Sequence, residues 1–180
     1  MPRLIVLNGP PGIGKSTLAR RYVEEHPLTL CLEQDVVREL LGGWRTRETD
    51  SGLLARTLCL AMARAHLDGG RDVIVPQFIA LPDYLDALAG VADAAGVDYV
   101  EVLLHDDADA AERRFHARID DPLWARHQAL AAVFIHEAGG YRGQYDRLVR
   151  ATEGRRLTKI PSVDGDADST YLALMAILGG

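Results

Sequence analysis

The sequence predicts an α/β protein with a parallel sheet, formed by one domain that spans residues 1–180. Two observations predict this class: short apolar strands alternate with helices along the chain, and the first strand leads directly into a glycine-rich turn. The length suits a single domain with a sizeable core. We find no repeat, linker or low-complexity segment that would divide the chain.

The first strand is predicted at Leu4-Ile5-Val6-Leu7, a continuous apolar run of the kind found in strands buried on both faces. The glycine-rich turn follows, and then a helix over about residues 16–25. The apolar face of this helix consists of Leu18, Ala19, Tyr22 and Val23. A second strand is predicted over residues 28–32, and a short helix over residues 35–41 ends at Gly42-Gly43.

A long helix is predicted over about residues 47–67 in the middle of the chain, followed by a third strand at Val73-Ile74-Val75. Its apolar side chains at helical spacing are Leu54, Leu58, Ala61 and Ala65. Another helix opens at Leu81-Pro82-Asp83, with proline in its first turn, and ends at Gly96. The fourth strand is predicted over residues 99–104.

The last third of the chain is predicted to begin with a helix capped by Asp106-Asp107. Two polar helices follow up to about residue 150, and then a fifth strand over 157–160 and a closing helix over 168–178. The segment from about residue 109 to residue 143 is less regularly apolar than the rest. We interpret it as a mobile cover over the site, within the same domain.

Composition and charge narrow the function classes. The formal net charge is −6 with acidic residues spread along the chain, whereas a nucleic-acid binder more often carries a basic stripe. The 2 cysteines and 6 histidines show no metal-ligand spacing. No apolar run approaches the ~20 residues that cross a bilayer, and the first residues lack the features of a signal peptide. We therefore expect a cytoplasmic protein without nucleic-acid or membrane partners.

The motif that carries chemistry is Gly9-Pro10-Pro11-Gly12-Ile13-Gly14-Lys15-Ser16, which fits the Walker A phosphate-binding pattern without a mismatch. Glycines let the backbone N–H groups wrap around phosphate oxygens, and the next helix points its positive end at the same anion. Lys15 is placed to reach the β- and γ-phosphates, the Ser16 hydroxyl to coordinate Mg²⁺, and Thr17 to bond the α-phosphate. The motif predicts ATP with Mg²⁺ as the ligand of this loop.

Two other interpretations of the loop are weaker. A chance glycine-rich turn is disfavoured because a buried strand precedes the loop and an amphipathic helix follows it. A dinucleotide-binding turn requires G-x-G-x-x-G, whereas position 17 is threonine.

With this loop in this context, the chain resembles the small-molecule kinases of the P-loop superfamily. That group includes nucleoside monophosphate, shikimate and gluconate kinases, chloramphenicol phosphotransferase and the zeta toxins. The resemblance spans the chain as strand order, although only the loop is a specific motif. It implies a five-stranded parallel sheet of order 2-3-1-4-5, and transfer of the γ-phosphate of ATP to a hydroxyl of a small molecule.

The resemblance also implies an acceptor site. The second strand of the family ends at the substrate hydroxyl, so Asp35 would orient or deprotonate that hydroxyl and Arg38 would hold the acceptor or the γ-phosphate. The alternative is that Asp35 caps the next helix and that Arg38 lies on the surface. The third strand ends at Val75-Pro76-Gln77 without an acid, which disfavours motor and helicase-like ATPases and leaves Gln77 to contact the substrate.

Arginines of the cover complete the implied catalytic set of Lys15, Asp35, Arg114 and Arg118. Arg114 and Arg118 are four residues apart and project from one face of a helix. By resemblance, they would stabilise charge on the transferring phosphoryl group, and the alternative is a solvated helix face paired with nearby acids. Two other functions remain open: a nucleotide kinase whose acceptor is a phosphate, and a nucleotide-binding regulatory protein without an acceptor.

Overall fold

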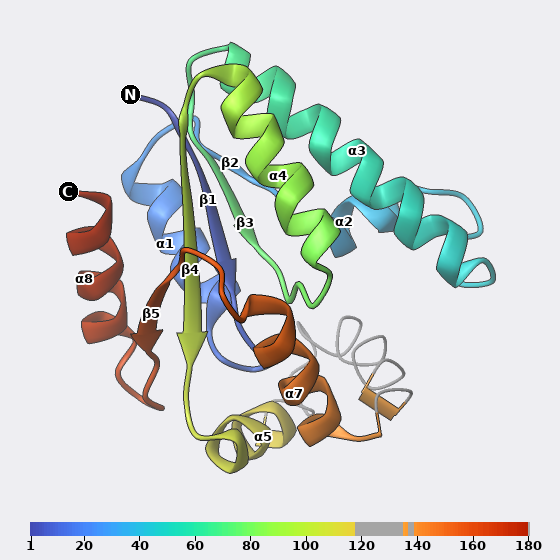
Figure 1. The fold of residues 1–180 in the computed structure, drawn as a ribbon, viewed down its shortest axis with the longest axis vertical. Helices are drawn as coiled ribbons and strands as arrows, with labels where there is room; N and C mark the ends of the chain where they lie inside the picture. Colours follow the sequence, from blue (N-terminus) through green and yellow to red (C-terminus); the bar gives the residue numbers. More distant parts are fainter. Residues whose placement is uncertain (118–134, 137–138, 180) are drawn as a thin grey trace.

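The computed structural model describes residues 1–117, 135–136 and 139–179. Five strands form one parallel sheet in the order β2-β3-β1-β4-β5 (Figure 1). The strands are β1 (Arg3–Asn8), β2 (Leu30–Cys31), β3 (Val73–Pro76), β4 (Asp98–His105) and β5 (Thr158–Pro161). The predicted α/β class and the strand order implied by the family resemblance are both confirmed.

The helices connect consecutive strands and follow the last one. In the described part of the chain they are α1 (Lys15–Glu25), α2 (Gln34–Glu39), α3 (Glu48–Asp68), α4 (Pro82–Ala95), α5 (Ala108–Ala117), α7 (Tyr141–Thr152) and α8 (Ala167–Leu178). None of the helices within these described ranges is long and apolar enough to span a membrane.

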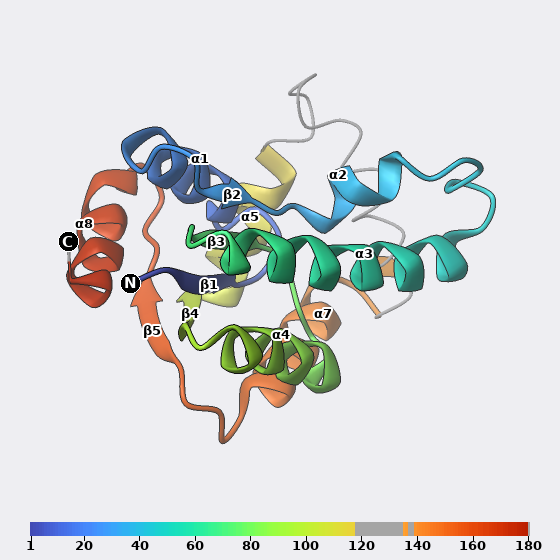
Figure 2. The same ribbon diagram turned by 90° about the horizontal axis from the view of Figure 1, so that it is seen from above.

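The core has two layers because successive side chains of a strand point to opposite faces of the sheet. Ile5 and Leu7 of β1 belong to a cluster with α1 and α8, whereas Leu4 and Val6 belong to a second cluster with α3 and α4. Figure 2 shows these helix pairs on opposite faces of the sheet. β1 is therefore buried on both faces, as its uninterrupted apolar run predicts.

The second strand is shorter than predicted, because it covers only Leu30–Cys31 rather than residues 28–32. Leu28 has a backbone φ of 71° and is 64% exposed, so the chain turns here instead of extending.

The apolar positions that the sequence singled out on α3 do not face the core. Leu54 and Leu58 are exposed, and so are Ala61 and Ala65. The buried face consists instead of Ser51, Ala55, Cys59, Ala63 and Leu67. Small side chains occupy most of this inner face because α3 packs closely against α2 and α4.

The strand topology gathers several loops at one edge of the sheet. All five strands are parallel, so their carboxyl ends point in the same direction. The glycine-rich loop after β1 therefore lies beside the segments that follow β2 and β3, which is the position where open α/β sheets bind ligands.

Candidate active site

The glycine-rich loop ends in a helix terminus suited to an anion. Gly14 is the N-cap of α1 and has a left-handed φ of 102°. The first turn closes through a bond from the Leu18 N–H to the Gly14 carbonyl, and the earlier N–H groups of the helix have no intrahelical partner. No acidic side chain lies in this turn. The positive end of α1 is therefore open to a ligand of negative charge.

Two glycines of the loop are required by their surroundings. Gly9 has a φ of 153°, and a Cβ atom on it would stand 2.7 Å from the Leu104 carbonyl oxygen. Gly12 has a φ of 82°, and its Cβ would stand 2.9 Å from the backbone N and Cα of Phe115. The loop therefore packs closely against β4 on one side and α5 on the other.

Asn8 anchors the start of the loop, and the sequence analysis did not identify it. Its fully buried side-chain Oδ1 accepts the N–H groups of Gly9 (2.8 Å) and Ile79 (2.9 Å), and its Nδ2 donates to the Ile79 carbonyl (2.9 Å). These bonds fix the phosphate loop to the segment that follows β3. The sequence did contain a signal for this role, because Asn8 directly follows a fully apolar strand. A side-chain amide buried at such a place needs hydrogen-bond partners.

The Lys15 ammonium lies over the loop. Its Nζ donates to the carbonyl oxygens of Gly9 (2.8 Å) and Pro10 (2.9 Å). These contacts hold the charge beside the N–H groups of the α1 terminus, where both act on one anion. The geometry suits the phosphate-binding role that the motif predicts for Lys15.

Glu33 lies beside the predicted Mg²⁺ ligand, Ser16. The Ser16 hydroxyl donates to Glu33 Oε2 at 3.3 Å, and the Glu33 carboxylate also lies 3.9 Å from Arg20 Nη2. Glu33 is the N-cap residue of α2, but its side chain makes no capping bond. Its carboxylate is therefore directed to the phosphate loop. The sequence signal that was missed is a second acid two residues before Asp35.

Asp35 and Gln77 meet at the edge of the sheet. Gln77 Nε2 donates to Asp35 Oδ2 at 3.5 Å, and both side chains are half-buried. They come from the segments after β2 and β3, which are neighbouring strands. Asp35 lies in the first turn of α2 rather than at its N-cap position. The structure thus brings together two residues predicted to contact the acceptor, and the alternative that Asp35 is a helix cap is wrong.

Arg38 is buried rather than exposed on the surface. Its Nε donates to Ser51 Oγ at 2.9 Å and its Nη2 donates to the Glu48 carbonyl at 2.8 Å. Its guanidinium carbon lies 5.6 Å from the centroid of the Trp44 ring. These contacts fasten α2 to the start of α3, and a contact of Arg38 with the acceptor remains a prediction.

The predicted cover is described only in part. Arg118 lies outside the described residues, as do residues 119–134 and 137–138. Arg114 is buried, and its Nη2 contacts Asp106 Oδ2 at 2.5 Å and the Ser162 carbonyl at 2.8 Å. The Ser162 hydroxyl donates in turn to the Ile13 carbonyl at 2.8 Å. Arg114 therefore links the base of α5 to the loop after β5 and, through Ser162, to the phosphate loop.

Phe115 and Tyr141 hold the outer side of the phosphate loop. The Tyr141 hydroxyl donates to the Pro11 carbonyl at 2.8 Å, and its ring lies 5.8 Å from that of Phe115. Burial raises the pKa of Tyr141 well above its usual value, so this hydroxyl stays protonated as a donor. Both residues belong to the predicted cover, Phe115 near its start on α5 and Tyr141 near its end on α7.

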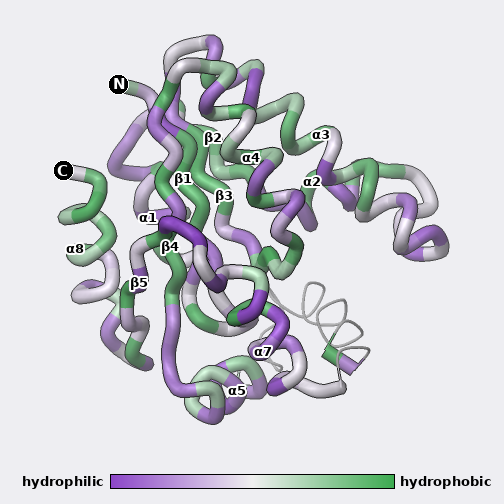
Figure 3. The backbone as a smooth tube through the Cα atoms, in the orientation of Figure 1, coloured by the Kyte–Doolittle hydropathy of each residue, from purple (hydrophilic) through white to green (hydrophobic). Residues whose placement is uncertain are grey.

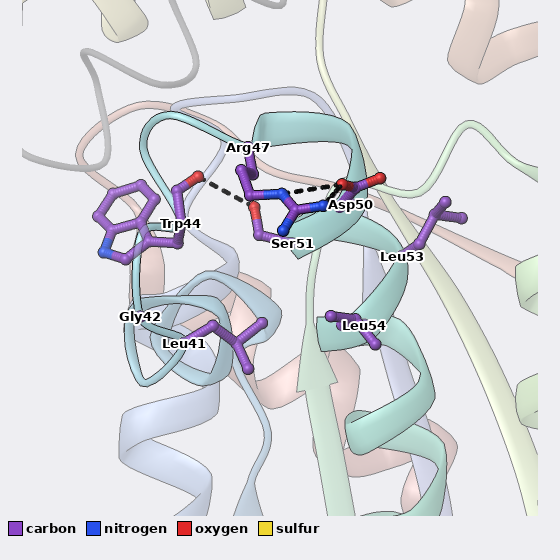
Figure 4. Close-up of a pocket in the computed structure, with 8 residues that line it drawn as sticks. All are labelled: Leu41, Gly42, Trp44, Arg47, Asp50, Ser51, Leu53 and Leu54. Atoms are coloured by element: carbon purple, nitrogen blue, oxygen red, sulfur yellow. Dashed lines mark hydrogen bonds and ion pairs between the residues drawn. The ribbon is translucent and has the colours of Figure 1, made fainter.

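A cavity of about 470 Å³ lies between the loop that follows α2 and the first turns of α3 (Figure 4). It is lined by Leu41, Gly42, Trp44, Arg47, Asp50, Ser51, Leu53 and Leu54. The Ser51 hydroxyl donates to the Trp44 carbonyl at 3.1 Å, and Arg47 Nη2 lies 2.8 Å from Asp50 Oδ2. Asp35 and Gln77 do not line this cavity.

Within the described ranges, no group of three or more His, Cys, Asp or Glu side chains is placed to hold a metal ion. The hydroxyl of Ser16 and the carboxylate of Glu33 are nevertheless hard oxygen donors. Mg²⁺ is commonly held by one or two such donors together with phosphate oxygens and water. The residues present therefore fit a Mg²⁺ ion that arrives with a nucleotide.

Comparison with known proteins relates this geometry to kinases. A family model described as an AAA domain matches residues 4–134. An adenylate kinase from Paracoccus denitrificans (strain Pd 1222) is 34% identical over 120 residues, which are 61% of this chain and 55% of that protein. The chain thus matches about half the length of this curated relative.

Three solved structures share the fold over almost the whole chain. A gluconokinase from Sinorhizobium meliloti 1021 has a TM-score of 0.63 and 21% identity, and the match covers 98% of this chain and 93% of that one. A tunicamycin resistance protein from Deinococcus radiodurans has a TM-score of 0.61 and 18% identity, with 99% and 96% covered. An APS kinase from Mycobacterium tuberculosis has a TM-score of 0.59 and 19% identity, with 99% and 98% covered.

Proposed function

The chain belongs to the AAA domain family, and from that membership and its site we propose that it is an ATP-dependent kinase that phosphorylates a hydroxyl of a small molecule. The observation that supports a hydroxyl group as the acceptor is the contact between Asp35 and Gln77 beside the phosphate loop. A carboxylate held at this position can accept the proton of an attacking hydroxyl.

The nucleotide is bound mainly by the backbone. The N–H groups of the loop and of the first turn of α1 surround the phosphates, and the Lys15 ammonium leaves the carbonyls of Gly9 and Pro10 to contact the β- and γ-phosphates. Asn8 and Tyr141 keep the loop in its binding conformation. We expect ATP to bind here with its triphosphate along the loop.

Ser16 and Glu33 would hold Mg²⁺, Ser16 by direct coordination and Glu33 through a water molecule or directly. When bound, the ion neutralises charge on the β- and γ-phosphates. We assign Glu33 and Asp35 different roles, because Glu33 contacts the phosphate loop whereas Asp35 contacts Gln77.

The transfer step forms one bond and breaks one. The acceptor oxygen bonds to the γ-phosphorus as the bond from that phosphorus to the β–γ bridging oxygen breaks, and ADP leaves with the bonding electrons. The hydroxyl proton passes to the Asp35 carboxylate. The Gln77 amide orients that carboxylate through its own N–H donor. Lys15 stabilises the charge on the transferring group, and Arg118 and Arg114 are proposed to contribute from the cover.

A nucleoside monophosphate kinase is the second candidate. The observation that favours it is the 34% identity with an adenylate kinase over 120 residues. Its acceptor would be a phosphate oxygen, which carries no proton that requires a base at neutral pH. Asp35 and Gln77 would then serve only to position the acceptor.

A screen of ATP consumption distinguishes the two candidates. The purified protein is incubated with ATP and Mg²⁺ against hydroxylated metabolites, nucleosides, hydroxyl-bearing antibiotics and nucleoside monophosphates. We expect consumption that depends on a hydroxylated acceptor and is lost in the Lys15→Ala variant. Consumption with nucleoside monophosphates alone would establish the second candidate. Consumption that no acceptor increases would overturn both.

A further inference from the structure

We propose that the outward face of α3 is a self-association surface, through which two copies of this chain pair with their α3 helices antiparallel across a two-fold axis. This proposal concerns a surface outside the phosphate loop and the Asp35–Gln77 pair, and it does not depend on the substrate. It rests on the apolar centre of α3, on the charges at its two ends, and on the cavity at its first turns.

The centre of the outward face is apolar and exposed. Leu53 and Leu54 are each 54% exposed, Leu58 is 41% exposed and Met62 is 38% exposed. The inner face of the helix packs on the core through Ala55, Cys59 and Ala63 instead. Figure 3 shows apolar segments along α3, on the outer flank of the molecule. Leu54 and Leu58 are one turn apart on the same side of the helix, and Leu53 and Met62 lie on its two flanks. Exposed apolar side chains grouped in this way typically mark a protein interface.

Each end of α3 carries an ion pair. The anion lies nearer the helix centre at the N-terminal end, and the cation lies nearer the centre at the C-terminal end. Arg47 and Asp50 lie at the N-terminal end, 2.8 Å apart, and Arg64 and Asp68 lie at the C-terminal end, also 2.8 Å apart. All four side chains are at least 43% exposed. Each end of the helix therefore presents one cation and one anion, with the apolar centre between them.

An antiparallel pairing makes these ends complementary. A two-fold axis that passes near residue 57 places residue 50 opposite residue 64 of the second copy, and residue 47 opposite residue 68. Asp50 then faces Arg64 of the partner subunit, and Arg47 faces Asp68 of the partner subunit. The same axis repeats each contact twice, because a two-fold interface uses the same patch on both subunits.

The cavity at the first turns of α3 suits the same pairing. Leu53 and Leu54 line it and also belong to the apolar centre (Figure 4). Leu54 lies one turn before Leu58 on the same side of α3, so it joins the rim of the cavity to the apolar centre of the helix.

A second copy fits this surface better than a nucleic acid does. A nucleic-acid site would require an excess of cations, whereas the charges of the α3 ends balance and the chain as a whole carries a net charge of −6. The Asp35 side of the site remains accessible in the pair, because the inner face of α3, with Cys59, is directed away from the outward face.

Oligomeric state and a charge exchange test the proposal. In light scattering after size exclusion, we expect the wild-type chain of 19.7 kDa to elute with twice that mass. Leu58→Glu should give a monomer with an unchanged circular dichroism spectrum and unchanged ATP binding. Leu172→Glu is the matched control, because Leu172 is 66% exposed on α8, and it should remain a dimer.

The charge exchange uses two variants, each of which would place like charges opposite one another in its own homodimer. Asp50→Arg places two arginines opposite one another, and Arg64→Asp places two aspartates opposite one another, so each variant alone should be monomeric. An equimolar mixture should form a heterodimer, because the reversed residue of each chain then faces an opposite charge. A wild-type chain that is monomeric up to its solubility limit, a dimer that survives Leu58→Glu, or a mixture that stays monomeric would each overturn the proposal.

Discussion

The side-chain amide nitrogen of Gln77 lies 3.5 Å from a carboxylate oxygen of Asp35. The two residues are 42 positions apart in the sequence, and they meet because β2 and β3 are parallel neighbours whose ends reach the same edge of the sheet. Two residues before Asp35, the Glu33 carboxylate accepts a hydrogen bond from the hydroxyl of Ser16. The segment after β2 thus places one carboxylate beside Ser16 of the phosphate loop and one beside Gln77.

Lys15→Ala should weaken ATP binding about 10- to 100-fold and abolish transfer, while the fold survives. A charge-assisted contact to phosphate contributes about 1.5–3 kcal/mol, and more is lost in the transition state. Calorimetric titration with a non-hydrolysable ATP analogue measures the binding loss. Lys159→Ala is the matched control, because Lys159 is the only other lysine and is exposed on β5. Normal turnover in Lys15→Ala would show that the loop is not the ATP site.

Asp35→Asn should leave ATP affinity nearly intact and lower turnover by ~10²-fold or more, the usual range for removal of a general base. The amide keeps the shape and the contact with Gln77 but no longer accepts the proton. Steady-state kinetics with the acceptor from the screen measure this loss.

Glu33→Gln is the matched carboxylate control for Asp35→Asn. Because Glu33 contacts Ser16, its loss should raise the Mg²⁺ concentration required for half-maximal turnover, which Asp35→Asn should leave unchanged. An Asp35→Asn variant with wild-type turnover would exclude the base role and favour positioning of the acceptor.

Gly12→Ala should weaken ATP binding. It should also lower the free energy of unfolding by more than the cost of holding an alanine in a left-handed conformation. The new Cβ would stand 2.9 Å from the backbone of Phe115, and backbone atoms cannot rotate away. Gly70→Ala separates the two effects, since Gly70 has a similar φ of 74° with no atom within 4 Å of its Cβ. A left-handed alanine costs about 1–2 kcal/mol. Equal losses in the free energy of unfolding for both variants would disprove close packing of the loop on α5.

Arg118→Ala should lower turnover more than it raises the Michaelis constant for ATP, because a cover arginine acts on charge that develops during transfer. Arg114→Ala should in addition lower the melting temperature, since it leaves Asp106 and the Ser162 carbonyl without their buried partner. Kinetics and thermal unfolding of both variants separate these roles. Unchanged kinetics in Arg118→Ala would identify it as a surface residue.

The sequence predicted the parts of this molecule that depend on local pattern. The buried run Leu4–Leu7, the loop after it and the amphipathic face of α1 all follow from residue order, and the structure agrees with them. The sheet order required a family resemblance, because nothing in a single strand specifies its neighbours.

Features that depend on tertiary contacts escaped prediction. Leu54 and Leu58 have helical spacing but are exposed, since the small residues on the other side of α3 allow it to pack closely on α4. Arg38 carries a charge but is buried against Ser51 and Trp44. Asn8 and Glu33 become recognisable only when Ile79 and Ser16 are brought beside them.

The identity of the phosphorylated product tests the central claim most directly. Phosphorus-31 NMR follows the wild-type protein with ATP, Mg²⁺ and the acceptor found in the screen. We predict a phosphomonoester signal that appears together with ADP, is coupled to a carbon-bound proton of the acceptor, and appears at least ~10²-fold more slowly with Asp35→Asn. A product with a new phosphoanhydride signal, or ADP with inorganic phosphate alone, would contradict transfer to a hydroxyl.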